Sequence, residues 1–334
     1  MSVAYRIFGS ENSPYSTKVR SYFRYKQIPH EWIIRTGATM EEYKKYARLP
    51  IVPAVATPED EALQDSTPII EEIERRIPAP SIHPADPTLR FLSELLEEFG
   101  DEWGNKWMFH YRWAREIDQK TVAHRLVSEM MAGAPDDQVE TMAVNVRERM
   151  SGRGFAVGSN EKTAPLIEES FKNGIGLLEK HLENRPFLFG AQPCFADLGL
   201  GAQVYQALID PTAGEILRTQ APSTAAWSES LLDPKDHGAF EDWSTLSPTL
   251  APLLSSEVRY FLAWSKANAE AIVAGADELT LDYDGRVWWQ TVGGPQKYHA
   301  KSLGELRRKY ANCAEVPELK TILASAGCEE FLVA

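Results

Sequence analysis

A polar segment near the start of the chain carries residue types that could activate a nucleophile. Residues 10–16 (SENSPYS) lie between a β-prone run at 3–8 and a stretch at 16–26 whose apolar residues recur at helical spacing. Their hydroxyl and amide groups should therefore gather at a helix N-terminus, where anions and thiolates are stabilised. The simpler interpretation is that Ser13 or Ser16 only caps the helix, with Pro14 near its first turn. The segment is a candidate site for activating sulfur.

Two further motifs follow in the same part of the chain. Val52-Pro53 places a proline in an otherwise apolar run, which favours a strand edge, a bulge or a cis peptide bond. Gln64, Asp65 and Ser66 directly precede a helical pattern, so a carboxylate and a hydroxyl would stand beside the free N–H groups of a helix start. An ordinary N-cap would have the same composition. These motifs are the second and third elements of the candidate site.

The elements that must position these motifs begin with a mixed α/β unit. Residues 1–78 show the order βαβ followed by ββα, with strands expected at 3–8, 30–35, 51–56 and 62–64 and helices at 16–26 and from Pro68 onward. Residues 79–87 are expected to form a stiff connector, because the prolines clustered there exclude a helix.

Beyond the connector, helical patterns dominate. Helices are expected at 88–116, 120–131, 136–150, 163–184, 195–208 and 213–219. This predicts an all-helical second domain over residues 88–239. Residues 240–334 then form a C-terminal extension, with a helix at 255–274, a two-stranded hairpin around Asp284-Gly285, and short helices at 301–312 and 317–325.

Composition limits the classes of function. The chain has 334 residues, and its 35 basic and 48 acidic side chains give a formal charge of −13. This sign disfavours nucleic acid and an anionic membrane surface as partners. Residues 1–78 hold eleven basic and eleven acidic side chains, so the acidic excess lies entirely beyond them. The chain therefore divides into two parts by charge, at the same place as by pattern.

The few, scattered cysteines and the lack of a recognisable targeting signal predict a cytoplasmic protein. The three cysteines, at 194, 313 and 328, are scattered and form no disulfide framework, and neither they nor the seven histidines show metal-ligand spacing. The N-terminus lacks a basic region followed by an apolar one, and no run of about 18 apolar residues occurs. We expect no metal and no membrane anchor.

Five motifs together resemble the glutathione transferase superfamily. SPYSTKVR at 13–20, the Val-Pro pair at 52–53 and the QDS triplet at 64–66 follow the order of its thioredoxin-like, glutathione-binding domain. Residues 187–203 are similar to the helix-opening motif of its second domain, and 221–232 to its Pro-x-x-x-x-Trp stretch. The resemblance implies an α/β thioredoxin-like N-terminal domain plus an all-α C-terminal domain, of the serine type. The C-terminal extension looks like that of a bacterial transferase-like subgroup.

The resemblance also implies roles for individual residues. Ser13 matches the serine that hydrogen-bonds the sulfur of glutathione and favours its thiolate. Val52 matches the position whose backbone pairs with the cysteinyl unit. Asp65 and Ser66 match the pair that receives the γ-glutamyl end, the first meeting its ammonium group and the second its carboxylate. The implied glutathione-binding set is Val52, Pro53, Gln64, Asp65 and Ser66.

The chain departs from the family pattern in front of the Val-Pro pair. Several serine-type members have Lys there, whereas this chain has Ile51. The glycyl carboxylate of glutathione would then need another cation, for which Arg48, Lys45 and Arg35 are the candidates. Weaker or altered glutathione affinity is a possible consequence.

Two observations on cysteine complete the comparison. Cys194 stands where the helix-opening motif usually has Ser or Thr, which predicts a poorer capping partner for Asp197. Residues 10–17 contain no cysteine, so disulfide exchange with glutathione through an enzyme thiol is disfavoured.

An aromatic segment at 99–113 (FGDEWGNKWMFHYRW) is the candidate wall of a second-substrate pocket. A period of 3.6 residues puts Trp103 and Trp107 on one helix face, with His110 and Tyr111 close by. In transferases of this fold the corresponding helix walls the electrophile pocket, so the resemblance implies a pocket built from these four side chains and Tyr15. The alternative is packing in the core or between domains.

The sequence thus predicts a cytoplasmic, homodimeric glutathione transferase that acts in detoxification. Its substrates would be glutathione and a small hydrophobic or aromatic electrophile, with no nucleic acid and no membrane as partner. The alternative is a protein that keeps the fold for binding or assembly without catalysis. The role of residues 240–334 is left open by the sequence.

Overall fold

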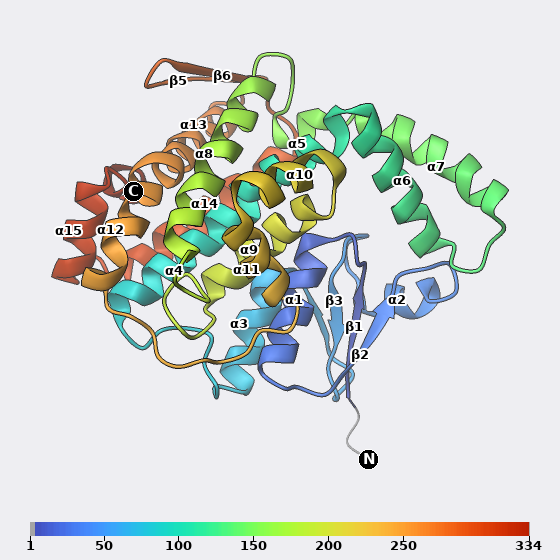
Figure 1. Ribbon diagram of the computed structural model, residues 1–334, viewed down its shortest axis with the longest axis horizontal. Helices are drawn as coiled ribbons and strands as arrows, with labels where there is room; N and C mark the ends of the chain where they lie inside the picture. The colour runs from blue at the N-terminus through green and yellow to red at the C-terminus, as the bar shows by residue number, and fades with distance from the viewer. Residues whose placement is uncertain (1–3, 334) are drawn as a thin grey trace.

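A four-stranded mixed sheet forms the N-terminal part of the protein. The computed structural model describes residues 4–333 (Figure 1). The sheet order is β2-β1-β3-β4, with β1 parallel to β2 and antiparallel to β3. The strands are β1 (Tyr5–Gly9), β2 (His30–Ile34), β3 (Ala54–Ala56) and β4 (Ala62–Gln64). The predicted thioredoxin-like strand order of βαβ followed by ββα is confirmed.

Helices cover both faces of this sheet because its buried strand residues alternate in direction. Ile7 packs with α1 (Pro14–Tyr25) and α3 (Ser66–Arg76), on the face that also meets the helical domain. Phe8, the next residue, packs on the other face with tyrosines of α2 (Met40–Tyr46). Helix α2 was not predicted; it has only 7 residues and a largely polar sequence.

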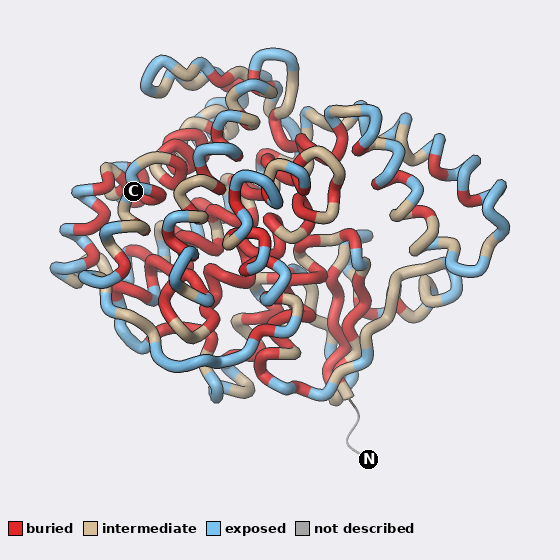
Figure 2. Tube along the Cα trace, in the orientation of Figure 1, coloured by how far each residue is buried: buried red, intermediate tan, exposed pale blue. Residues whose placement is uncertain are grey.

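The second domain is helical, as predicted, and α9 (Phe195–Leu208) lies at its centre. This helix packs against α4 (Pro87–Phe99), α5 (Asn105–Ala114) and α1. The remaining helices are α6 (Glu116–Met130), α7 (Asp136–Ser151), the 3-10 helix η2 (Gly154–Val157), α8 (Ala164–Leu182), α10 (Pro211–Gln220) and α11 (Pro222–Ser230). Figure 2 shows buried chain concentrated around this centre, while α6 and α7 project from the body.

The predicted helix at 88–116 is interrupted by a π-helical turn, η1 (Gly100–Gly104). Gly100 lies so close to α9 that a Cβ atom there would be 2.5 Å from the Cα of Leu200. Close packing of two backbones at this point requires glycine. The π-turn changes the direction in which the following acidic and aromatic side chains point, which helical periodicity in the sequence does not reveal.

A buried carboxylate joins the start of α9 to its surroundings. Asp197 accepts hydrogen bonds from the N–H of Cys194 (2.8 Å) and from its Sγ (3.0 Å). Its other oxygen accepts from the N–H of Leu188 (2.8 Å) and from Nε1 of Trp227 in α11 (2.9 Å). Cys194 and Asp197 thus form a reciprocal capping box with sulfur in place of the usual hydroxyl oxygen. That Cys194 is a poorer capping partner than Ser or Thr stays a prediction.

The C-terminal extension is part of the helical core. Its elements are α12 (Trp243–Leu253), the π-turn η3 (Leu254–Val258), α13 (Arg259–Val273), the hairpin β5 (Glu278–Tyr283) and β6 (Arg286–Thr291), α14 (Gly294–Ala311), α15 (Pro317–Ser325) and α16 (Glu329–Leu332). Apolar residues of these helices belong to the same buried cluster as those of α4, α5 and α8. Helix α12 was missed because Pro248 and Pro252 lie inside it, where proline normally argues against a helix.

Lys106 of α5 is enclosed where this extension meets the helical domain. Its side chain is buried, with Nζ 3.6 Å from the ring centroid of Trp264 in α13 and 3.2 Å from the carbonyl oxygen of Val157. Burial lowers the pKa of Lys106 to about 7. The contact therefore couples the stability of the extension to pH.

We expect Lys106→Met to remove a pH-dependent component of stability. The unfolded lysine has a pKa near 10.4, so between that value and about 7 the unfolded chain binds the extra proton. The contribution of Lys106 to the free energy of unfolding should decrease as pH falls from about 10 to about 7. Below about pH 7 this contribution should stay constant. Urea unfolding at several pH values should show wild type gaining on the variant as pH rises. A constant difference, as expected for the exposed Lys320→Met, would contradict the prediction.

No helix within residues 4–333 is long and apolar enough to cross a membrane.

Candidate active site

Ser13 occupies the N-cap of α1 with extended backbone angles (φ −107°, ψ 120°). Its Oγ accepts a hydrogen bond from the N–H of Ser16 at 3.2 Å. A hydroxyl has one proton to donate besides its two acceptor positions, and within residues 4–333 no acceptor is recorded for that of Ser13. Capping and sulfur activation are therefore compatible, since one uses the oxygen and the other the proton.

The helical domain holds the loop in front of Ser13. Glu129 at the end of α6 accepts from Oγ of Ser10 (2.6 Å), from Nδ2 of Asn12 (2.9 Å) and from the N–H of Glu11. Arg112 of α5 donates to the carbonyl oxygen of Asn12 at 2.9 Å. The sequence contained no signal for these contacts, because they join residues about 100 positions apart.

The second element of the site is the segment before β3. The Val52-Pro53 bond is cis, one of the three alternatives predicted for this pair. Val52 is half-buried, whereas Ile51 is exposed. Arg48 is also exposed, and Arg35 donates to the carbonyl oxygen of Pro50 at 3.0 Å. Cationic side chains thus flank the segment although Lys is absent from position 51.

Gln64 braces this segment from β4. Its Oε1 accepts from the N–H groups of Arg48 and Leu49, both at 3.0 Å. Its Nε2 donates to the carbonyl oxygens of Leu49 (2.8 Å) and Ile51 (3.0 Å). The amide is therefore committed to the loop, and Gln64 is better described as a loop-holding residue than as a direct ligand contact.

Asp65 and Ser66 form the third element, at the start of α3. Asp65 has a positive φ of 79° and makes no side-chain capping bond to the helix. Although much of Asp65 stays accessible, desolvation raises the pKa of its carboxyl, while Lys18 and the Ser66 backbone act in the opposite direction. Ser66 is buried, with its Oγ 3.5 Å from Nζ of Lys18.

Sequence reasoning missed Lys18, which lies fully buried behind this third element. Its Nζ is 2.7 Å from Oδ2 of Asp101 in η1, 2.9 Å from Oγ1 of Thr67, and also pairs with Glu97 of α4. Burial raises the pKa of Asp101 to about 7. The available signal was the i, i+4 spacing of Glu97 and Asp101, which puts two acids on one helix face.

The aromatic segment at 99–113 is mostly core, which is the alternative considered for it. Trp103 and Trp107 are buried, and both indole N–H groups donate to Oγ of Ser170 in α8 at 2.9 Å. His110 and Tyr111 are buried as well. Neither these four residues nor Tyr15 line either described cavity; α8 and the C-terminal extension cover the tryptophan face.

Tyr15, the remaining aromatic candidate, lies between the domains. Its hydroxyl donates to the carbonyl oxygen of Asp101 at 3.0 Å, and burial raises its pKa well above the usual value. Tyr15 is two residues from Ser13, so it borders the site from the α1 side.

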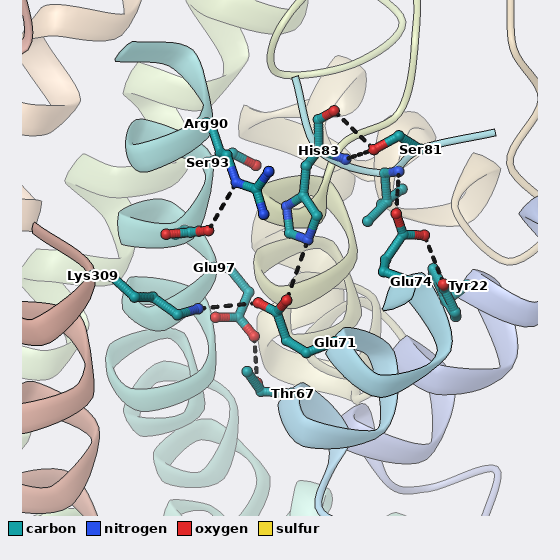
Figure 3. A network of polar contacts seen from close by, with 12 residues as sticks. Tyr22, Thr67, Glu71, Glu74, Ser81, His83, Arg90, Ser93, Glu97 and Lys309 are labelled. Atoms are coloured by element: carbon teal, nitrogen blue, oxygen red, sulfur yellow. Dashed lines mark hydrogen bonds and ion pairs between the residues drawn. The ribbon is translucent and has the colours of Figure 1, made fainter. Parts of the chain in front are cut away.

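A cavity of about 620 Å³ lies between α3, α4 and α14, away from Ser13. Thr67 is one of its lining residues, and ion pairs border it (Figure 3). Lys309 of α14 lies 3.1 Å from Glu71 of α3, and Arg90 lies 3.5 Å from Glu94 in α4. The C-terminal extension thereby reaches the helix that carries Asp65 and Ser66 at its start.

No group of three or more His, Cys, Asp or Glu side chains in the part of the chain that is described could hold a metal ion.

Two family models match the chain. Residues 12–76 match the glutathione S-transferase N-terminal domain, and residues 145–230 match the glutathione S-transferase C-terminal domain. The first match contains all three elements of the site, from Ser13 to Ser66. The protein belongs to the glutathione transferase superfamily, with its thioredoxin-like and all-helical domains.

Three solved structures of similar proteins have sequence identities to this chain below 25%. A glutathione S-transferase from Methylobacillus flagellatus, solved with glutathione bound, is 20% identical with a TM-score of 0.41, covering 68% of this chain and 94% of its own. One from Rhodospirillum rubrum is 18% identical with a TM-score of 0.44, covering 75% of this chain and 91% of its own. A β-etherase from Sphingobium is 19% identical with a TM-score of 0.45, covering 69% of this chain and 95% of its own. No curated protein sequence matched significantly.

Proposed function

We propose that the protein is a glutathione transferase that activates the thiol of glutathione for attack on a small electrophile. The observation that carries this proposal is the position of Ser13 at the N-cap of α1, where its Oγ accepts from the N–H of Ser16 and its hydroxyl has no acceptor among residues 4–333. A free cysteine thiol has a pKa of about 8.5, so at neutral pH most of it is protonated and weakly nucleophilic. A donor at a helix N-terminus favours the thiolate, because both the hydroxyl and the helix dipole stabilise negative charge.

The tripeptide is proposed to contact all three elements of the site. The backbone of Val52 pairs with the cysteinyl unit, Asp65 receives the ammonium group of the γ-glutamyl end, and Ser66 receives its carboxylate. Arg48 is the proposed cation for the glycyl carboxylate, as it is exposed on the loop braced by Gln64. The resemblance within residues 12–76 supports these assignments.

The second substrate is proposed to be a small hydrophobic or aromatic electrophile that approaches Ser13 beside Tyr15. In the reaction the glutathione sulfur forms a bond to the electrophilic carbon, and a leaving group departs or a proton is taken up. Membership of the superfamily also supports a homodimer, which light scattering would test, and a cytoplasmic location, which cell fractionation would test. It further supports a role in detoxification.

Calorimetric titration with glutathione tests the proposed binding site. We expect saturable binding to the wild type and about 10- to 100-fold weaker binding to Asp65→Asn, because a charge-assisted contact to the ammonium group is worth about 1.5–3 kcal/mol. Asparagine tolerates the positive φ at this position, so the substitution removes charge without backbone strain.

Asp60→Asn is the matched control for that titration. Asp60 also has a positive φ (66°), but it pairs with Arg6 and Tyr46 in the β3–β4 turn. Its replacement should leave glutathione affinity unchanged. Equal affinity of wild type and Asp65→Asn would reject the γ-glutamyl assignment. No binding to the wild type at millimolar glutathione would favour a binding or assembly protein that keeps only the fold.

A further inference from the structure

Lys18 is a buried cation with partners on three elements. Its side chain is fully inaccessible to solvent, and it lies on the second turn of α1, five residues after Ser13. Burial by itself would lower the pKa of Lys18, but Asp101 and Glu97 raise it above its usual value, so the side chain is charged. A buried charge is retained only where paired groups compensate it.

Its contacts join the start of α3 to the helical domain. Nζ faces Thr67 (2.9 Å) and Ser66 (3.5 Å) on α3, and Asp101 (2.7 Å) and Glu97 on the other side. Thr67 in turn donates to Glu97 at 2.6 Å, a bond visible in Figure 3. The ammonium group of Lys18 and the carboxylate of Glu97 therefore both bind the first turn of α3.

The polarity of these hydrogen bonds matters for Ser66. An ammonium group only donates, so Oγ of Ser66 faces Lys18 as an acceptor. The hydroxyl proton of Ser66 must then point elsewhere, and the ligand side is where a carboxylate could accept it. Lys18 also offsets Glu97 and Asp101, which would otherwise repel a carboxylate arriving at Ser66.

We propose that Lys18 is a positioning residue for the γ-glutamyl carboxylate, acting by orienting Ser66 and by compensating the acids beneath α3. This inference rests on the proposed function, because it concerns the same glutathione site. It predicts that Lys18 governs recognition of one carboxylate of the tripeptide and leaves the chemistry at sulfur unchanged.

Lys26, the C-cap residue of the same helix, provides a comparison. It is buried at the other end of α1, where it pairs with Glu74 at 2.8 Å and donates to the carbonyl oxygen of Pro80 at 2.7 Å. None of its partners belongs to the three site elements. Replacing either lysine removes a buried ion pair and lowers stability, so Lys26→Met reproduces the structural cost of Lys18→Met without the positioning role.

The test compares two probes by calorimetry: glutathione, and 4-aminobutyryl-Cys-Gly, which lacks only the γ-glutamyl carboxylate. Wild type should prefer glutathione by about tenfold or more, the value of one charged hydrogen-bonded contact. Lys18→Met should bring this preference below about threefold, whereas Lys18→Arg and Lys26→Met should keep most of it. In turnover assays Lys18→Met should raise the KM for glutathione about tenfold and change kcat less than about threefold.

The outcomes distinguish failure of the proposed function from failure of the role proposed for Lys18. Absence of glutathione binding to the wild type overturns the proposed function and this inference with it. Glutathione binding by the wild type, together with an unchanged probe preference in Lys18→Met, overturns the inference alone. If Lys18→Met does not fold, the paired variant Lys18→Met with Glu97→Gln keeps the local net charge, and the same preference is measured on it. A wild-type preference in that variant also overturns the inference.

Discussion

Replacing Ser13 by alanine is expected to lower kcat/KM for conjugation of a reactive aryl halide by about 100-fold, while glutathione affinity changes little. The hydroxyl of Ser13 is the donor that we propose for the sulfur, and loss of one such donor to an anion typically lowers the rate by about 10²–10³. The pKa of the bound thiol should rise by about one to two units. Thiolate absorbance of the complex, followed against pH, measures that rise directly.

Two variants separate sulfur activation from helix capping. Ser13→Gly removes the hydroxyl but costs a helix N-cap only a few tenths of a kcal/mol, and Ser13→Thr keeps both functions. Glycine should therefore be as inactive as alanine, and threonine should restore most activity. Wild-type turnover in Ser13→Gly, or an unchanged thiol pKa, would show that Ser13 serves only as a cap.

Replacing Asp197 by alanine should destabilise the protein by about 3–5 kcal/mol. The substitution leaves the N–H groups of Cys194 and Leu188 and the indole N–H of Trp227 buried without their acceptor, each at a cost of about 1–3 kcal/mol, partly offset by relaxation. The loss combines a helix cap with the tie between α9 and α11, so it should exceed that of an ordinary cap. Urea denaturation with linear extrapolation measures the free energy of unfolding.

Asp242→Ala provides the scale for that measurement. Asp242 caps α12 by accepting from the N–H of Thr245 at 2.9 Å, but it is solvent-accessible, so its loss should cost about 1 kcal/mol. Asp197→Asn should fall between the two, because the amide can still accept from Trp227 but presents a donor to Cys194. If Asp197→Ala costs no more than Asp242→Ala, the buried network carries no special weight.

The C-terminal extension changes how the two-domain pattern should be understood. Its apolar residues fill the same core as α4, α5 and α8, and Lys309 pairs with Glu71 on α3. An extension that only trails from a finished domain would not share its core. The extension therefore bears on the stability of the helix that begins at Asp65 and Ser66.

The sequence predicted the fold and the three site elements because these depend on local patterns. Strand alternation, helical spacing and turn residues are read within a few positions, and the motifs around Ser13, Val52 and Asp65 are short and contiguous. The hairpin at Asp284-Gly285 was predicted for the same reason, and both residues have the positive φ that such a turn needs. The roles of the site residues remain proposals.

Local patterns failed where two distant segments share one environment. The tryptophans of η1 and α5 are buried by α8 and α13, so the side chains expected to wall a pocket belong to the core. Ser66 lies against the buried Lys18 through a contact between α1 and α3 within the N-terminal domain. The loop before Ser13 is held by Glu129 through a contact between the two domains.

By itself the sequence predicted the strand order of the N-terminal domain, the helical character of the second domain and the motifs around Ser13, Val52, Asp65 and Ser66, but not α2, α12 or the π-turn η1. Only the tertiary structure decided that Gln64 is committed to a loop, that Trp103 and Trp107 are core, and that Lys18 lies beneath the start of α3. The physical reason is that burial and charge compensation depend on which surfaces pack together. The groups that desolvate a residue and pair with it come from chain segments that can lie well over a hundred positions away, as Trp264 and Trp288 do from Trp103, and no local spacing specifies them.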